Sequence, residues 1–171
     1  MPGHRRSYRR VYQPGGTYFF TLVLADRSQD SLTRHIGLLR SALLEEKHSH
    51  PFALLAWVVL PEHLHLLCRL PPDDSDYPNR LRRFKARFSR GLPASEAIGD
   101  SRRSKRERGI WQRRYWEHLI RDADDLQRHI DYIHFNPVKH GRARSPGEWP
   151  HSSFAHFVDK GLYPWDWGSP E

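Results

Sequence analysis

Cysteine is almost absent from this chain of 171 residues, because Cys68 is the only one. A single thiol excludes an internal disulfide framework and a metal site built from several cysteines, and it fits a reducing cytoplasm. Long hydrophobic runs are missing too: the longest covers residues 52–60, far fewer than the ~20 residues that span a bilayer. No apolar segment follows the charged start MPGHRRSYRR, so neither a secretory signal nor a membrane partner is expected.

Positive charge, by contrast, is in excess. The chain has 28 Lys and Arg against 20 Asp and Glu, a net charge of +8 and a pI near 10.0. The excess gathers in residues 79–90, 101–109 and 111–116, and in the first and third of these segments aromatic residues stand between the basic ones. Basic side chains bind phosphates and aromatic rings stack on unpaired bases, so this pattern favours a nucleic-acid partner over a merely solvated cationic surface.

Hydrophobic periodicity and turn residues divide the chain into seven elements. Strands are predicted at residues 17–25, 52–60, 63–70 and 110–121, and helices at 30–50, 79–92 and 122–136. The order strand, helix, strand, strand, helix, strand, helix predicts an α+β fold of the ferredoxin-like (split β-α-β) kind, with an antiparallel sheet, helices on one face and an additional C-terminal helix that bears candidate site residues. We expect one domain over residues 1–171, with a basic arm at 1–14, a flexible basic loop at about 92–109 and a turn-rich tail at about 141–171.

Two histidines stand one residue apart in the apolar stretch VVLPEHLHLL. Successive side chains of a strand point to opposite faces, so His63 and His65 are predicted to project together while Leu64 and Leu66 point the other way. Two neutral imidazoles on one rigid strand can supply two ligands for a divalent ion. The alternative is a pair of half-buried structural histidines. Glu62 is a candidate for orienting one imidazole.

The last predicted helix offers groups that could complete such a site. Tyr132 and Asn136 in DYIHFNPVKHG are four residues apart and therefore neighbours on one helix face. The amide oxygen of Asn136 is a possible hard ligand, and a tyrosine beside a cation can act as a nucleophile. A packing aromatic is the alternative for Tyr132. His134 and His140 are further histidines near this site, although His134 is expected to face elsewhere. His118 is a candidate supporting residue, but a structural role is favoured for it.

These residues together resemble the REP-associated tyrosine transposases, of the single-tyrosine HUH transposase superfamily. The resemblance rests on PEHLH followed by DYIHFNPVKHG, and it extends from GGTYFFT through EWPHSSF to GLYPWDW. The basic segment at residues 94–108 departs from what is expected of this family.

The resemblance implies a metal-dependent endonuclease and strand transferase acting on single-stranded DNA beside a REP-like hairpin, in the bacterial cytoplasm at the nucleoid. His63, His65 and Asn136 would bind Mg²⁺ or Mn²⁺, and Tyr132 would form a 5′-phosphotyrosine link. No ATP is required, in agreement with the absence of a GxxxxGK[ST] motif. Monomer and dimer both stay open.

The hairpin would be held by basic residues, as phosphate contacts position a duplex. The candidates are Arg5, Arg6, Arg9 and Arg10 in the arm, Arg82, Arg83, Lys85 and Arg87 in the second predicted helix, and Arg113 and Arg114 before the fourth strand. Two other functions compete with the transposase. A non-catalytic nucleic-acid-binding module is the main alternative, but the central strands lack the aromatic RNA-binding signature. A rolling-circle initiator or relaxase would normally carry further domains or tyrosines.

Overall fold

A four-stranded antiparallel sheet forms the centre of the protein. The computed structural model describes residues 9–93 and 109–171. Its strands are β1 (Thr17–Val23), β2 (Ala53–Val59), β3 (His63–Arg69) and β4 (Trp116–Leu119), in the order β2-β3-β1-β4. This is the predicted ferredoxin-like order, in which β2 and β3 form a hairpin and β1 lies between β3 and β4.

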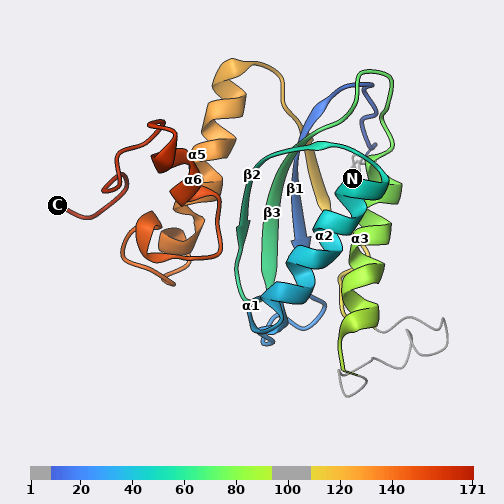
Figure 1. The fold of residues 1–171 in the computed structure, drawn as a ribbon, viewed down its shortest axis with the longest axis horizontal. Coiled ribbons are helices and arrows are strands. Elements are labelled where there is room, and N and C mark those ends of the chain that lie inside the picture. Colours follow the sequence, from blue (N-terminus) through green and yellow to red (C-terminus); the bar gives the residue numbers. More distant parts are fainter. Residues whose placement is uncertain (1–8, 94–108) are drawn as a thin grey trace, which may run out of the picture.

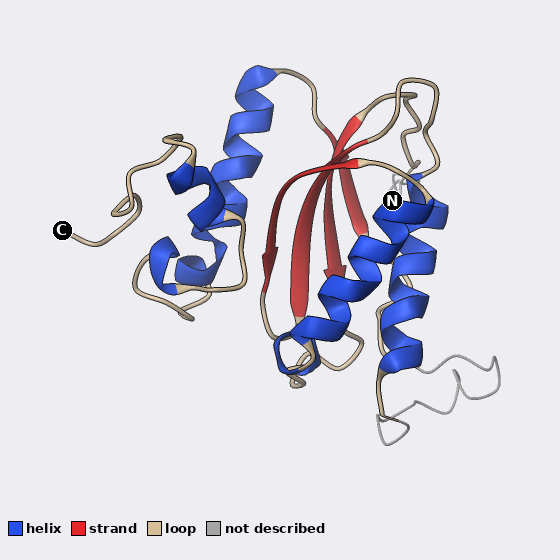
Figure 2. Ribbon diagram, viewed as in Figure 1, coloured by secondary structure: helices blue, strands red, loops and turns tan. Residues whose placement is uncertain are grey.

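Helices cover both faces of this sheet (Figure 1, Figure 2). One face carries α2 (Ile36–Ser49) and α3 (Tyr77–Gly91), preceded by the short α1 (Ser31–Arg34). The other face carries α5 (Ala123–Lys139), against which the C-terminal segment with η1 (Pro146–Glu148) and α6 (Phe154–Asp159) packs. The helix predicted to bear the nucleophile therefore lies across the sheet from the other two long helices.

Strand alternation divides the apolar residues between two cores. On β1, Tyr18, Phe20 and Leu22 enter the larger core under α2 and α3. Phe19 points to the opposite face and joins Leu67 and Ile133 in a smaller core under α5. Because both faces are packed, the central strands are buried along nearly their whole length. The smaller core fixes the position of α5 on the sheet.

Three predicted elements have different bounds in the structure. The first helix divides at His35, whose backbone angles (φ −110°, ψ 38°) are not helical. The fourth strand is much shorter than the predicted residues 110–121. Trp111 pairs with Leu24 and Trp116 pairs with Thr21, so this chain advances five residues while β1 advances three. The extra residues therefore form a bulge and do not join the ladder.

The last helix does not end before Pro137 but continues to Lys139. Proline lacks only the bond to the carbonyl four residues earlier, and so close to a helix end little is lost. The turn is completed when the His140 N–H donates to the Asn136 carbonyl (3.1 Å). Asn136 is therefore held inside the helix, fully buried.

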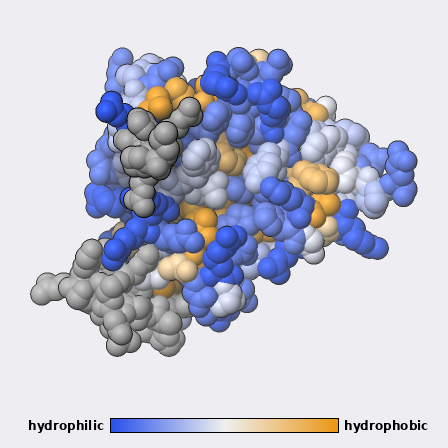
Figure 3. Space-filling view, turned by 180° about the vertical axis from the view of Figure 1, so that it is seen from behind, coloured by the Kyte–Doolittle hydropathy of each residue, from blue (hydrophilic) through white to orange (hydrophobic). Residues whose placement is uncertain are grey.

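The surface agrees with the charged composition. Figure 3 shows a mainly hydrophilic face on which the hydrophobic patches are small and separate. Over residues 9–93 and 109–171, no helix is both long and apolar enough to cross a membrane.

The contact of α5 with the sheet yields a stability prediction. Ile133 has no exposed surface and packs in the smaller core. We expect Ile133→Ala to lower the free energy of unfolding by roughly 2–5 kcal/mol, because it leaves a cavity there. Urea denaturation measures the change. Leu44→Ala, at a helical leucine that is 63% exposed, is the control and should stay within about 0.5 kcal/mol of wild type; equal losses for the two variants would contradict this description of the core.

Candidate functional site

His63 and His65 lie on the α5 face of β3. They are 4% and 3% exposed, and their rings are 5.1 Å apart between centroids at an interplanar angle of 77°. Leu64 and Leu66 enter the opposite core, as strand alternation predicts. Both imidazoles are thus enclosed between the sheet and α5.

A hydrogen bond at Nδ1 orients each of the two imidazoles. Nδ1 of His63 is 2.8 Å from Oε1 of Glu62, and Nδ1 of His65 is 2.9 Å from the hydroxyl of Thr21 on β1. When Nδ1–H donates to such an oxygen, Nε2 carries the lone pair. The expected orienting role of Glu62 therefore has a geometric basis, whereas Thr21 was not singled out by the sequence; only its register opposite His65 points to it.

The Nε2 atoms form a set of acceptors with Asn136. Nε2 of His63 is 3.3 Å from Oδ1 of Asn136. If Nδ1–H of His63 donates to Glu62, Nε2 of His63 and Oδ1 of Asn136 both present lone pairs to each other. A cation between these two atoms would stabilise this arrangement. Nε2 of His65 is buried without a hydrogen-bond partner, as is Nδ2 of Asn136. Two imidazole nitrogens and an amide oxygen are a donor set that fits a divalent ion.

Burial keeps the His65 ring uncharged. Removal from water, with smaller effects of His63 and His140, lowers the pKa of His65 to about 3, so the ring is neutral at physiological pH. Burial acts to raise the pKa of Glu62, but the hydrogen bond from His63 and smaller effects that include nearby Arg142 outweigh it, and the net shift is downward. Glu62 is therefore an ionised carboxylate that can strengthen His63 as a ligand.

Tyr132 borders this group of side chains. Its ring lies 5.4 Å from that of His65 and 5.9 Å from that of Phe19, edge to face in both cases. Tyr132 is 37% exposed, so part of the residue can be reached from solvent. Nζ of Lys139 donates to this hydroxyl (3.2 Å) and lies 4.7 Å from the ring centre. The sequence interpretation did not single out Lys139, although its place seven residues after Tyr132 puts it on the same helix face.

The other two histidines of this region differ in position. The ring of His140 lies 4.8 Å from that of His63, at the exposed edge of the site. His134 is fully buried on another side of α5, where Nε2 and the Ser153 hydroxyl are 2.7 Å apart. His134 therefore faces away from Tyr132, as its helical position predicts.

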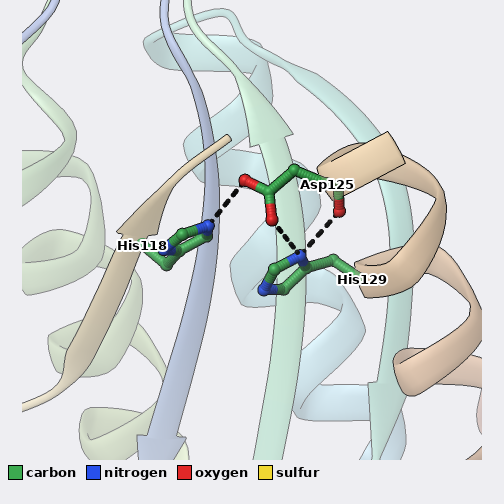
Figure 4. A group of neighbouring side chains, drawn as sticks. All are labelled: His118, Asp125 and His129. Atoms are coloured by element: carbon green, nitrogen blue, oxygen red, sulfur yellow. Dashed lines mark hydrogen bonds and ion pairs between the residues drawn. The ribbon is translucent and has the colours of Figure 1, made fainter. Parts of the chain in front are cut away.

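His118 belongs to a separate group with Asp125 and His129 (Figure 4). One ligand atom from each lies within 4.8 Å of the others, a spacing compatible with a metal ion. The Asp125 carboxylate, however, already accepts hydrogen bonds from His118 (2.8 Å) and from the backbone N–H of Arg121 (2.9 Å). The guanidinium groups of Arg121 and Arg128 are each 3.4 Å from it. The two guanidinium cations and the occupied acceptor sites of this carboxylate do not favour a metal centre. They favour a structural role, in which Asp125 links β4 to the start of α5.

Few of the basic residues named from the sequence lie near Tyr132. Those on α3 are on the opposite side of the sheet, and several are bound within the protein: Arg83 donates to buried Glu46 (2.8 Å), and Arg10 donates to Glu117 (3.0 Å). Lys85, Arg87 and the exposed Arg82 also donate to protein oxygens. Arg9, Arg113 and Arg114 are exposed as well. Arg5, Arg6 and the basic segment 94–108 lie outside the described residues.

Comparisons with known proteins agree with this geometry. No protein-family model matches the chain. It is 47% identical over 163 residues to a REP-associated tyrosine transposase of Haemophilus influenzae, covering 95% of this chain and 93% of the relative. It is 42% identical over 160 residues to a REP-associated tyrosine transposase of Escherichia coli, covering 94% and 89%. A solved structure of a REP-associated tyrosine transposase bound to a REP hairpin matches with a TM-score of 0.83 at 42% identity, covering 95% of this chain and 91% of that one.

The Asp125 group allows a test by pH. Burial acts to raise the pKa of Asp125, but hydrogen bonds from His118 and Arg121 outweigh it and lower that pKa well below its ordinary value. A lowered folded pKa gives stability that is present above the unfolded pKa of ~3.9 and is lost as the pH falls through the folded value. We expect Asp125→Asn to be roughly 1–3 kcal/mol less stable at pH 5–7, with the gap narrowing only below about pH 4.

Urea denaturation at pH 7, 5 and 3.5 measures this dependence. Asp124→Asn is the matched control, since Asp124 is an exposed carboxylate in the same helical turn. The structural role of Asp125 would be contradicted if the stability difference between wild type and Asp125→Asn were the same at pH 3.5 as at pH 7. It would also be contradicted if Asp124→Asn lost as much stability as Asp125→Asn.

Proposed function

This chain belongs to the REP-associated tyrosine transposases, and we propose that it cuts and rejoins single-stranded DNA beside a REP-like hairpin, with Tyr132 as the nucleophile. It is an HUH-type tyrosine transposase by its identity to curated relatives over nearly the whole chain. One observation carries the residue assignment: two oriented imidazoles, an amide oxygen and a partly exposed tyrosine meet between β3 and α5. We propose that residues 1–171 work as one domain.

We propose that His63, His65 and Asn136 hold a divalent ion, Mg²⁺ or Mn²⁺. Their buried acceptor atoms support this, since His65 Nε2 has no other partner and His63 Nε2 faces Asn136 Oδ1. When bound, the ion would polarise a phosphate oxygen and offset charge on the phosphoryl group. Glu62 and Thr21 fix the two rings, so the ligands need little rearrangement.

Tyr132 is the proposed nucleophile. Its phenolic oxygen forms a bond to the scissile phosphorus while the bond from phosphorus to the 3′-oxygen breaks. The phenol loses its proton and the departing 3′-oxygen gains one, so the products are a 5′-phosphotyrosine and a free 3′-hydroxyl. The Lys139 ammonium donates to the phenolic oxygen, so a positive charge lies beside the attacking atom.

The covalent link explains how cutting and rejoining can occur without ATP. It keeps the energy of the phosphodiester bond, so a 3′-hydroxyl can attack the phosphotyrosine and restore DNA. The ring of Tyr132 is wedged against Phe19 and His65, which limits how far its oxygen can move between the two steps. A pre-positioned nucleophile lowers the entropic cost of each attack.

The hairpin is the proposed partner because the matching solved structure is of a relative bound to a REP hairpin. Arg82, Arg113 and Arg114 lie at the surface, and surface arginines can contact phosphates, which position a stem without reading its sequence. We place this activity in the bacterial cytoplasm, where chromosomal DNA is found.

The nucleophile can be tested by trapping. We expect wild type with Mn²⁺ and a labelled REP-like hairpin bearing a single-stranded flank to give an adduct that survives SDS. Tyr132→Phe should abolish the adduct, because phenylalanine has no oxygen to bond phosphorus. Tyr12→Phe, at a tyrosine that is 56% exposed, is the control and should form as much adduct as wild type. Adduct from Tyr132→Phe would contradict the assignment; hairpin binding without any adduct from wild type would support a non-catalytic binding module.

The metal ligands can be tested without DNA. We expect Mn²⁺ to bind wild type with one site by calorimetry, and His65→Ala to weaken binding at least tenfold because one of three ligands is gone. His48→Ala, at an exposed histidine of α2, serves as the control. Binding that His65→Ala leaves intact but Asp125→Ala removes would move the metal site to the His118 group.

A further inference from the structure

An open depression lies on the side of Tyr132 that faces away from the metal site. Its volume is about 480 Å³, within the range of pockets that take small organic groups. It is lined by Arg128, Asp131, Tyr132, Phe135, Trp167 and Gly168. Tyr132, the proposed nucleophile, therefore borders two sites. One is the proposed ion site, and the other is this depression, which has no role in the reaction described so far.

Helical geometry separates the two sides of Tyr132. At 100° per residue, Asn136 is about 40° round α5 from Tyr132 in one direction, and Phe135 is about 60° in the other. Asn136 is fully buried toward the histidines, whereas Phe135 is 39% exposed. Phe135 therefore presents an apolar ring to the depression on the side of Tyr132 opposite the histidines.

The far wall of the depression is built rigidly by the C-terminal segment. The Trp167 ring packs on that of Tyr163 at 4.6 Å, and the Tyr163 hydroxyl donates to Asp131 on α5. Gly168 has a φ of +72°, and a Cβ there would lie 3.2 Å from the Phe135 ring. Only glycine readily permits both this backbone conformation and this approach.

The chemistry of the lining identifies the class of occupant. The Phe135 and Trp167 rings lie edge to face, with centroids 6.3 Å apart and an interplanar angle of 86°. Arg128 has a largely exposed side chain (63%) at the rim. Aromatic faces take up nucleobases, and arginine pairs with phosphate. A strand whose phosphate meets the Tyr132 hydroxyl must place its neighbouring nucleotides beside that residue, so one unpaired base lies within reach of the depression.

We propose that an unpaired nucleobase adjacent to the scissile phosphate stacks on the ring of Phe135 and contacts Trp167 at its edge, with Arg128 toward the DNA backbone. The proposal rests on the proposed function, and it makes Phe135 a positioning residue. Stacking of this base fixes the strand on one side of the phosphorus, while the ion fixes the phosphate on the other. The phosphate is then aligned for attack by Tyr132.

The test couples a protein change to a DNA change. Single-turnover adduct formation with Mn²⁺ is measured for wild type and Phe135→Ala, on hairpin DNA whose unpaired segment carries one abasic nucleotide at successive positions. We expect Phe135→Ala to slow the reaction roughly tenfold on intact DNA. An abasic site at one position should slow wild type similarly, and the two changes together should be no slower than either alone.

Conservative variants and a neighbouring tryptophan provide the controls. Phe135→Tyr, which keeps a stacking ring, should retain the wild-type rate. Trp165 is 59% exposed and lies in the same C-terminal segment but does not line the depression. Trp165→Ala should therefore leave the rate of adduct formation unchanged. If thermal melting shows Phe135→Ala to be unfolded, Phe135→Leu replaces it, since leucine keeps the apolar volume without the ring.

Three outcomes would overturn the proposal. The first is that no abasic position couples to Phe135. The second is that Trp165→Ala shows the same non-additivity with the abasic position as Phe135→Ala does. The third is that removing the Phe135 or Trp167 ring accelerates adduct formation, which would mean that this segment obstructs the strand. In all three cases wild type still forms adduct, whereas failure of the proposed function itself would leave wild type without adduct on any DNA.

Discussion

The placement of α5 against β3 is the constraint on which the rest of the site depends. The contact between His63 and Asn136 spans 73 residues of sequence and joins a strand to the helix packed on it. It exists because Ile133 and Phe19 share the smaller core with β2 and β3. At the other end of the helix, Asp125 joins α5 to β4 through His118. An apolar contact in the middle and a polar joint at the start thus hold the face of the helix that bears Tyr132.

Much of this arrangement could be predicted from the sequence because it follows local periodicity. Alternation on a strand placed His63 and His65 on one face, and a four-residue step placed Tyr132 and Asn136 on one face of a helix. The strand and helix order predicted the sheet topology. That both pairs should meet was expected from the resemblance to a family, since neither spacing contains that information.

Other features depend on tertiary packing and could not be predicted locally. Pro137 suggested a helix end, but the bond from His140 to the Asn136 carbonyl completes the turn around it. The bulge between Trp111 and Trp116 shortens β4 because it depends on the register with β1. Thr21 supports His65 only through cross-strand pairing, and Arg83 binds Glu46, which precedes it by 37 residues. A run of arginines therefore gives the net charge correctly, but it does not say which of them remain free for DNA.

The site has two kinds of chemistry on either side of one tyrosine. Toward the sheet are neutral imidazoles, an amide oxygen and an orienting carboxylate, which suit a hard or borderline cation. Toward solvent are aromatic rings and an arginine, which suit a nucleotide. The central claim is that the ion is held at His63, His65 and Asn136 while Tyr132 faces the phosphate. A crystal structure of Tyr132→Phe with Mn²⁺ and hairpin DNA, phased to show the anomalous signal of manganese, tests it most directly. We expect one manganese peak within coordination distance of His63 Nε2, His65 Nε2 and Asn136 Oδ1. A peak at Asp125 instead, or no peak beside His63, would contradict this assignment of the metal ligands.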